Sequence, residues 1–141
     1  MKVANSLAKR VRARANHSCE YCKLPERFDD YPFEIEHVVA AQHGGKPIYR
    51  NLALACMTGN RHKGPNLAGI DPRTHKRVWL FDPRKQKWAR HFRWKGPVLV
   101  GRTSVGRATV AVLGINVEHR VRARAELIAE GVFPSGSDAE G

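Results

Sequence analysis

One histidine, one glutamate and two asparagines in the first half of the sequence could together activate a water molecule and hold a divalent cation. They are Glu36, His37, Asn51 and Asn60. An imidazole with a pKa of about 6.5 is largely neutral at pH 7 and can accept a proton from water. The carboxylate of Glu36 and the amide oxygen of Asn60 are hard ligands of the kind that Mg²⁺ and Mn²⁺ prefer. A histidine beside a glutamate is a weak signal alone, so the surrounding residues must support it.

Three cysteines surround these residues. Cys19 and Cys22 form a Cys-x-x-Cys pair, whereas the later Cys56-Met-Thr-Gly59 keeps only its first thiol. An odd number of cysteines that includes a Cys-x-x-Cys pair favours metal binding in a reducing cytosol over a disulfide framework. We therefore predict a cytoplasmic protein.

The order of these residues resembles the HNH, or ββα-metal, endonucleases. The shared frame comprises Glu36-His37, Gly44-Gly45, Asn51-Leu52 and the run from Asn60 to Gly64. The resemblance covers Cys19 to Gly64 and implies two antiparallel strands followed by a helix. It also implies that His37 is the general base, that Glu36 and Asn60 bind a catalytic Mg²⁺ or Mn²⁺, and that the substrate is DNA.

The remaining polar residues of the frame are expected to position the site or to contact nucleic acid. An amide cannot exchange protons near pH 7, so Asn51 should hydrogen-bond the loop and hold His37 in place. Residues two apart on a helix differ by about 200° of rotation, so His62 cannot share a metal ion with Asn60, whereas Lys63 can share its face. We expect Lys63 to contact a phosphate. The weaker candidates for nucleic-acid contact are Arg61, His62 and His43.

The cysteine frame departs from its family at one position. Relatives with a first Cys-x-x-Cys usually carry a second one directly before the third motif residue, and the four thiolates bind a structural zinc. Gly59 supplies no ligand, and a closed zinc site needs four. Three alternatives stay open: Cys19, Cys22 and Cys56 bind zinc with water or His17 as the fourth ligand, they bind it weakly, or they persist without metal. We favour the absence of tightly bound zinc, because a weakened site loses much of the folding free energy that zinc provides.

The pattern of apolar residues predicts the elements that carry the motif. Helical spacing over residues 2–16 predicts an amphipathic, basic helix. Phe33 to His37 alternates as a strand does, Leu52 to Ala55 can form the returning strand, and Asn60 to Leu67 can begin a helix. Adjacent strand residues point to opposite faces, so Glu36 and His37 require a twisted or bulged strand end to serve one site.

The second half of the chain predicts a different kind of structure. Four short segments are strand candidates, and 117–128 is a helix candidate. The aromatic residues Trp79, Trp88, Phe92 and Trp94 are expected in the core, with base stacking as the alternative. The strand candidates are 77–81, 91–94, 97–101 and 108–112.

Together these elements predict an α+β fold: a small ββα-metal core with an N-terminal helix and a C-terminal extension of short antiparallel strands plus a helix. We expect one domain at 1–133, with the core motif at 19–67, the extension at 70–133 and a disordered tail at 134–141.

Charge and hydropathy narrow the class of partner. The 141 residues include 25 Lys and Arg against 13 Asp and Glu, a net charge of +12. Such a balance favours a polyanion, because neutralising phosphates releases counterions. Charged residues interrupt the N-terminal segment where a signal peptide is apolar, and the apolar segment 109–117 is far shorter than the roughly 20 residues that span a bilayer. We expect no membrane insertion.

The leading hypothesis is a metal-dependent DNA endonuclease. The alternative is a non-catalytic nucleic-acid-binding module derived from such a nuclease, and a purely structural zinc-ribbon adaptor is disfavoured by the missing thiol. The oligomeric state, the sequence specificity and the choice between nicking and double-strand cutting stay open.

Overall fold

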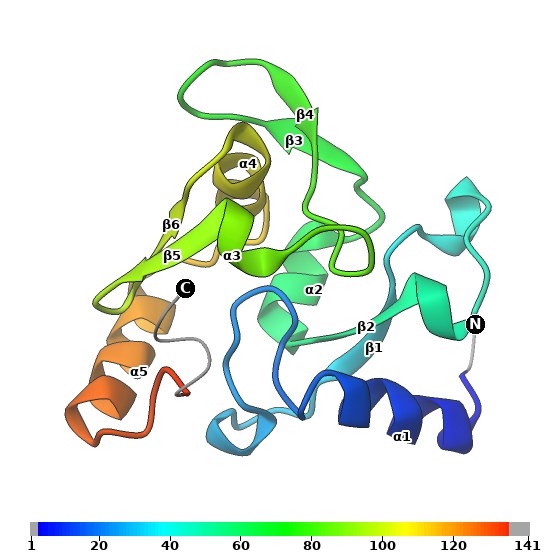
Figure 1. Cartoon of the computed structure of the whole chain (residues 1–141), viewed down its shortest axis with the longest axis horizontal. Helices are drawn as coiled ribbons and strands as arrows, with labels where there is room; N and C mark the ends of the chain where they lie inside the picture. The colour runs from blue at the N-terminus through cyan, green and yellow to red at the C-terminus, as the bar shows by residue number, and fades with distance from the viewer. Residues whose placement is uncertain (1–2, 136–141) are drawn as a thin grey trace.

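The computed structural model describes residues 3–135, which form an α+β fold around one core. Within that range, five α-helices accompany three separate two-stranded antiparallel ribbons (Figure 1). The predicted fold class is therefore confirmed. Across the same residues, none of the helices is both long enough and apolar enough to cross a membrane.

The N-terminal helix α1 spans Asn5–Arg14 and lies beneath the first ribbon (Figure 1). Val11 on its inner face is fully buried, and Val3 and Leu7 pack against the same core. The helix ends because Asn16 and His17 adopt a left-handed conformation, each with φ of 54°. The predicted helix is confirmed, although its first predicted residue, Lys2, lies outside the described range.

The first ribbon pairs β1 (Glu34–His37) with β2 (Leu52–Ala55), and α2 (Met57–Lys63) follows directly. The short 3₁₀ turns of this half are η1 (Glu26–Phe28), η2 (Ala41–His43) and η3 (Tyr49–Asn51). Helix α2 begins and ends earlier than predicted. The Cys56 thiol caps it by accepting a hydrogen bond from the Gly59 amide at 3.4 Å, and Gly64, at φ +52°, ends it before Pro65.

The extension contains two further ribbons and three helices. The ribbons are β3 (Ala68–Ile70) with β4 (Arg77–Trp79), and β5 (Phe92–Lys95) with β6 (Val98–Gly101). The helices are α3 (Trp88–His91), α4 (Ser104–Val112) and α5 (Glu118–Ala129).

The predicted strand at 108–112 is wrong, because these residues belong to helix α4. Thr103 caps the helix by accepting a hydrogen bond from the Gly106 amide at 3.1 Å. The Thr109 hydroxyl donates to the Val105 carbonyl at 2.7 Å and accepts from the Phe81 amide at 2.9 Å. The Thr109 side chain therefore points inward from the helix and connects α4 to the segment after β4. The β-branched residues at 108–112 had suggested a strand instead.

Aromatic rings join the two halves of the chain into one core. Phe81 packs edge-to-face on both Tyr21 and Phe92, with ring centroids 6.3 Å and 5.1 Å apart. Trp94 packs edge-to-face on the buried Phe133, with ring centroids 5.2 Å apart. The predicted tail at 134–141 begins directly after Phe133, and its residues 136–141 lie outside the described residues. Trp79 is the exception among the expected core aromatics, because it is 70% exposed.

Candidate active site

His37 stands at the end of β1 and opens onto a shallow groove of about 240 Å³. Glu36, Asn60 of α2 and the Gly64-Pro65 turn line the same groove. The His37 Nε2 atom is buried and has no hydrogen-bond partner within residues 3–135. Burial lowers the pKa of this imidazole, so the ring is neutral at pH 7 and can accept a proton.

Asn51 fastens the loop that follows His37. Its Oδ1 accepts a hydrogen bond from the Val39 amide at 3.0 Å, and its Nδ2 donates to the carbonyls of Val39 and Lys46 at 3.1 Å and 3.0 Å. A Cβ atom at Gly45 would lie 1.7 Å from the Val39 carbonyl oxygen, so only glycine permits this close approach. These are the contacts expected of a side chain that positions His37 without taking part in proton transfer.

Asn60 contacts Glu34 and not Glu36, the residue with which it was expected to share a metal ion. Its Nδ2 donates to Glu34 Oε1 at 3.1 Å, and Arg61 lies 3.5 Å from the other oxygen of that carboxylate. The Glu34 side chain is about one-third exposed, at 31%. Glu34 and Asn60 therefore bring a carboxylate and an amide together beside the groove.

Glu36 lies in the protein interior, two residues along the same face of β1. It accepts a hydrogen bond from the Tyr21 hydroxyl and forms an ion pair with Lys63, whose Nζ is 3.4 Å from Oε2. Burial raises the pKa of Glu36, while the Lys63 charge and the Tyr21 hydroxyl act in the opposite direction. The register continues regularly to the His37–Leu52 pair, so Glu36 and His37 point to opposite faces. Of the two alternatives, a twisted or a bulged strand end, the regular pairing excludes the bulge.

The residues expected to contact nucleic acid lie in different environments. Lys63 is 2% exposed, and its ammonium also donates to the Val38 carbonyl at 3.3 Å, so a phosphate contact would require it to leave Glu36. A buried carboxylate needs a nearby positive charge, and this need explains the position of the lysine. Arg61, His62 and His43 are exposed, and the His62 ring lies 2.8 Å from the Thr58 carbonyl.

The oxygen donors fit a hard divalent cation. Asn60 and Glu36 line the groove with His37, and Glu34 contacts Asn60 beside it, so a cation there could retain water molecules and meet a phosphate oxygen. Glu36 fits less well in this arrangement, because Tyr21 and Lys63 already satisfy its carboxylate.

The three cysteines form a buried cluster. The Sγ atoms of Cys19, Cys22 and Cys56 lie within 4.8 Å of one another, and no other His, Cys, Asp or Glu of residues 3–135 joins them. His17, the expected alternative fourth ligand, is exposed and outside the cluster. Burial raises the pKa of Cys19 to about 12, whereas hydrogen bonds from the neighbouring thiols lower that of Cys22.

A four-coordinate structural zinc does not fit this cluster as it stands. An Arg120 guanidinium nitrogen lies 3.3 Å from the Cys56 sulfur, so a cationic side chain from α5 already occupies the open side of the thiols. The cluster therefore has three candidate ligands and a positive charge where a fourth ligand belongs.

Three residues that matter to these sites escaped prediction from the sequence. Glu34 lies outside the HNH frame, although its two-residue spacing from Glu36 places both on one face of the strand. Tyr21 lies between the first two cysteines, and a buried hydroxyl there has no sequence signature. Arg120 is 64 residues from Cys56, and no local pattern connects them.

Comparisons with known proteins agree with this geometry. The model of the family described as HNH endonuclease matches residues 19–66, which include the three cysteines, the β1–β2 ribbon and α2. No curated protein and no solved structure matches the chain significantly. Residues 19–66 are therefore similar to the HNH endonuclease family.

Proposed function

We propose that this protein is a metal-dependent DNA endonuclease in which His37 accepts a proton from the attacking water. The observation that carries the proposal is the environment of the imidazole: Nε2 is buried without a partner in the described residues, at a groove shared with Asn60. An unsatisfied buried polar atom costs about 1–3 kcal/mol, so its retention favours a role with a ligand. The free thiols favour the reducing cytoplasm as its compartment.

The proposed reaction makes one bond to phosphorus and breaks another. The water oxygen attacks the phosphorus while His37 takes its proton. The bond between phosphorus and the 3′ oxygen then breaks, and the departing oxygen gains a proton from solvent, which leaves a 3′-hydroxyl and a 5′-phosphate. Asn51 keeps the imidazole in position through its hydrogen bonds to the loop.

A bound Mg²⁺ or Mn²⁺ would stabilise the negative charge that develops on the phosphoryl and departing oxygens. Asn60 is the proposed amide ligand. Glu34 is our preferred carboxylate ligand because it contacts Asn60. Glu36, which the family resemblance favours, would first have to separate from Lys63.

A plasmid assay tests both the activity and the ligands. Supercoiled DNA should become relaxed or linear in Mg²⁺ or Mn²⁺ and should stay intact when a chelator is present. Glu34→Gln should slow cleavage at least about tenfold, by analogy with other lost metal-site interactions, and more than Glu36→Gln does. The reverse order would assign Glu36 as the ligand. A folded protein that cleaves no DNA with either cation contradicts the proposal.

One observation favours the alternative of a non-catalytic nucleic-acid-binding module. Lys63 forms a buried ion pair with the motif carboxylate Glu36, and this arrangement needs no metal ion. This alternative predicts DNA binding that is unaffected by a chelator and is accompanied by no cleavage, so the same assay separates the two functions.

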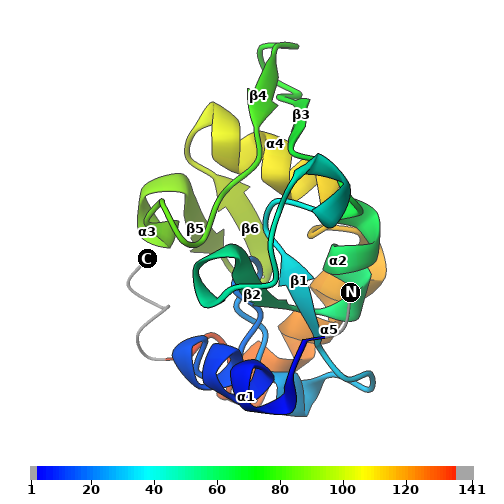
Figure 2. The same cartoon turned by 90° about the vertical axis from the view of Figure 1, so that its right-hand side faces the viewer.

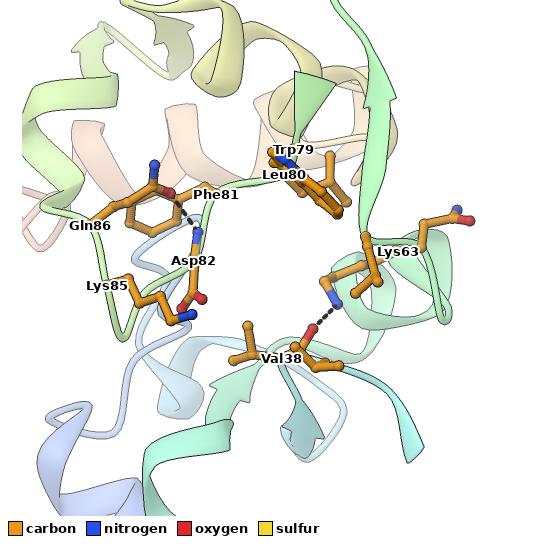
Figure 3. Close-up of a pocket in the computed structure, with 11 residues that line it drawn as sticks. Val38, Lys63, Trp79, Leu80, Phe81, Asp82, Lys85 and Gln86 are labelled. Atoms are coloured by element: carbon orange, nitrogen blue, oxygen red, sulfur yellow. Dashed lines mark hydrogen bonds between the residues drawn. The ribbon is translucent and has the colours of Figure 1, made fainter. Parts of the chain in front are cut away.

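The β3–β4 hairpin is the surface that we propose for contact with DNA. It projects beyond α4 (Figure 2). Arg77 and the exposed Trp79 share one face of β4, and with His43 they line a groove of about 570 Å³. Trp79 also borders a neighbouring cavity of about 470 Å³, which reaches Lys63 and the exposed Lys85 (Figure 3). Basic side chains around an exposed ring suit a phosphate backbone with an unpaired base.

Replacing Trp79 with alanine should weaken the binding of single-stranded DNA by roughly 5- to 100-fold, because stacking contributes about 1–3 kcal/mol per base. The melting temperature should hardly change, since the ring is 70% exposed. Fluorescence anisotropy with a labelled oligonucleotide measures the effect. Ile70→Ala is the matched control, an exposed aliphatic residue on the same hairpin. Equal weakening by both substitutions would exclude stacking as the cause.

A further inference from the structure

The thiol cluster is closed by an arginine from outside the HNH domain. Cys22 and Cys56 place their sulfur atoms 3.9 Å apart, and the Gly59 amide donates to Cys56 Sγ at 3.4 Å. The remaining side is covered by Arg120, whose Nη2 donates to the same sulfur at 3.3 Å. Arg120 lies in α5, 54 positions after the last residue that matches the family.

Arg120 covers the position at which relatives carry their fourth thiol. A Cβ atom built at Gly59 would lie 3.1 Å from the Cys56 sulfur, 3.7 Å from Arg120 Nη2 and 3.8 Å from Leu113 Cδ2. The glycine thus leaves a gap beside the sulfur atoms, and the guanidinium and a leucine methyl group border it. A thiol at position 59 and the guanidinium of Arg120 would compete for one space.

The other end of the guanidinium is fixed independently of the thiols. Its Nη1 donates to the carbonyls of Leu113 and Gly114 at 2.8 Å and 3.1 Å. These carbonyls follow the last turn of α4, where the helix leaves acceptors without intrahelical donors. An incoming Zn²⁺ would have to displace a cation that holds three hydrogen bonds, or else lie close to it in a site of low dielectric constant.

We infer that Arg120 replaces both the fourth thiol and the zinc. Helix α5 thereby closes the thiol cluster, and the HNH domain folds without metal in this cluster. The guanidinium takes the bridging role that zinc has in relatives: it connects the thiol cluster to the carbonyls at the end of α4. Unlike zinc, it also connects the domain to the extension, which makes the domain dependent on α5.

Metal content and thermal stability test this inference without reference to activity. The purified wild-type protein should contain much less than one zinc per chain, and a zinc chelator should leave its melting temperature unchanged. Arg120→Ala should lower the melting temperature by roughly 5–10 °C, through the loss of three hydrogen bonds. Arg122→Ala is the matched control, because that arginine of the same helix is 65% exposed and forms an ion pair with Glu118, one turn earlier.

Two further variants keep the test decisive if Arg120→Ala fails to fold. Gly59→Cys alone should gain zinc poorly because Arg120 competes, whereas Gly59→Cys with Arg120→Ala should bind one zinc per chain and melt lower in a chelator. One tightly held zinc in the wild-type protein, or equal zinc uptake by the single and double variants, would overturn the inference.

Discussion

Replacing His37 with alanine should lower the rate of metal-dependent DNA cleavage by about 10²- to 10⁴-fold, which is the usual contribution of a positioned general base. DNA affinity should persist, because the proposed binding hairpin does not include this residue. The melting temperature should not fall sharply, since the buried Nε2 atom makes no hydrogen bond within residues 3–135 that the substitution could remove. Plasmid cleavage under excess cation, together with anisotropy, measures rate and affinity separately.

The pH dependence gives this prediction its sign. Burial lowers the pKa of His37, so the neutral base persists to a pH below the ordinary value of about 6.5. Cleavage should therefore be constant near pH 7 and should fall only when the pH drops below the lowered pKa of His37. In the alanine variant this acid limb should vanish from the residual rate.

His119→Ala is the matched control for His37→Ala, because His119 is an exposed histidine of α5 far from β1 in the sequence. It should cleave at the wild-type rate. If His37→Ala cleaves at the wild-type rate while the protein stays folded, His37 is not the base and the mechanism fails.

The sequence predicted the ribbon of the site well because its pattern is local. The alternation of apolar and polar residues from Phe33 to His37 predicted strand β1, which pairs in regular register with β2. The first and last residues of α2 were harder to predict, because the helix is capped by the thiol of Cys56, a residue that we had considered as a zinc ligand. A side chain with two possible uses has no unique interpretation without coordinates.

The extension was harder to predict because local propensity and tertiary packing disagree there. Thr109, Val110 and Val112 favour a strand by residue type, yet the Thr103 cap and packing against the β3–β4 ribbon produce a helix. At Gly69 a Cβ atom would lie 2.4 Å from Val112 Cγ2, so this packing requires a glycine in β3. Such long-range complementarity has no periodic signature.

The candidate site was predictable in its residues but not in their pairing. Helical spacing correctly placed Asn60 and Lys63 on one face, and β1 presents a glutamate to each. Which glutamate contacts which partner depends on burial: the buried carboxylate of Glu36 pairs with the lysine, and the one-third-exposed carboxylate of Glu34 accepts from the amide.

The Glu36–Lys63 pair leads to the second large expected effect. Lys63→Met should destabilise the protein by about 3–5 kcal/mol at pH 7, because it leaves a buried carboxylate without its positive partner. The expected loss is large because the side chains of Lys63 and Glu36 are only 3% and 4% exposed. Chemical denaturation measures the change. Lys85→Met, an exposed lysine at the rim of the same cavity (Figure 3), should change stability by less than about 0.5 kcal/mol.

The loss should depend on pH in a defined direction. Burial already raises the pKa of Glu36, and removing Lys63 takes away the strongest influence that lowers it. A carboxyl group with a raised pKa in the folded state favours folding when it is protonated. The penalty of Lys63→Met should therefore be full near pH 8 and should shrink as the pH falls toward 4.5, the ordinary pKa of a glutamate side chain.

A second substitution distinguishes an unpaired charge from lost packing. Adding Glu36→Gln to Lys63→Met removes the buried charge and keeps an oxygen that can accept the Tyr21 hydroxyl. The double variant should regain most of the lost stability and lose its pH dependence, because coupled sites are not additive. A double variant that is as unstable as Lys63→Met would mean that the lysine stem, rather than its charge, stabilises the fold. In that case the Lys63 charge would not be needed to keep the Glu36 carboxylate in place. Glu36 could then separate from Lys63 at little cost, which would favour it as a metal ligand.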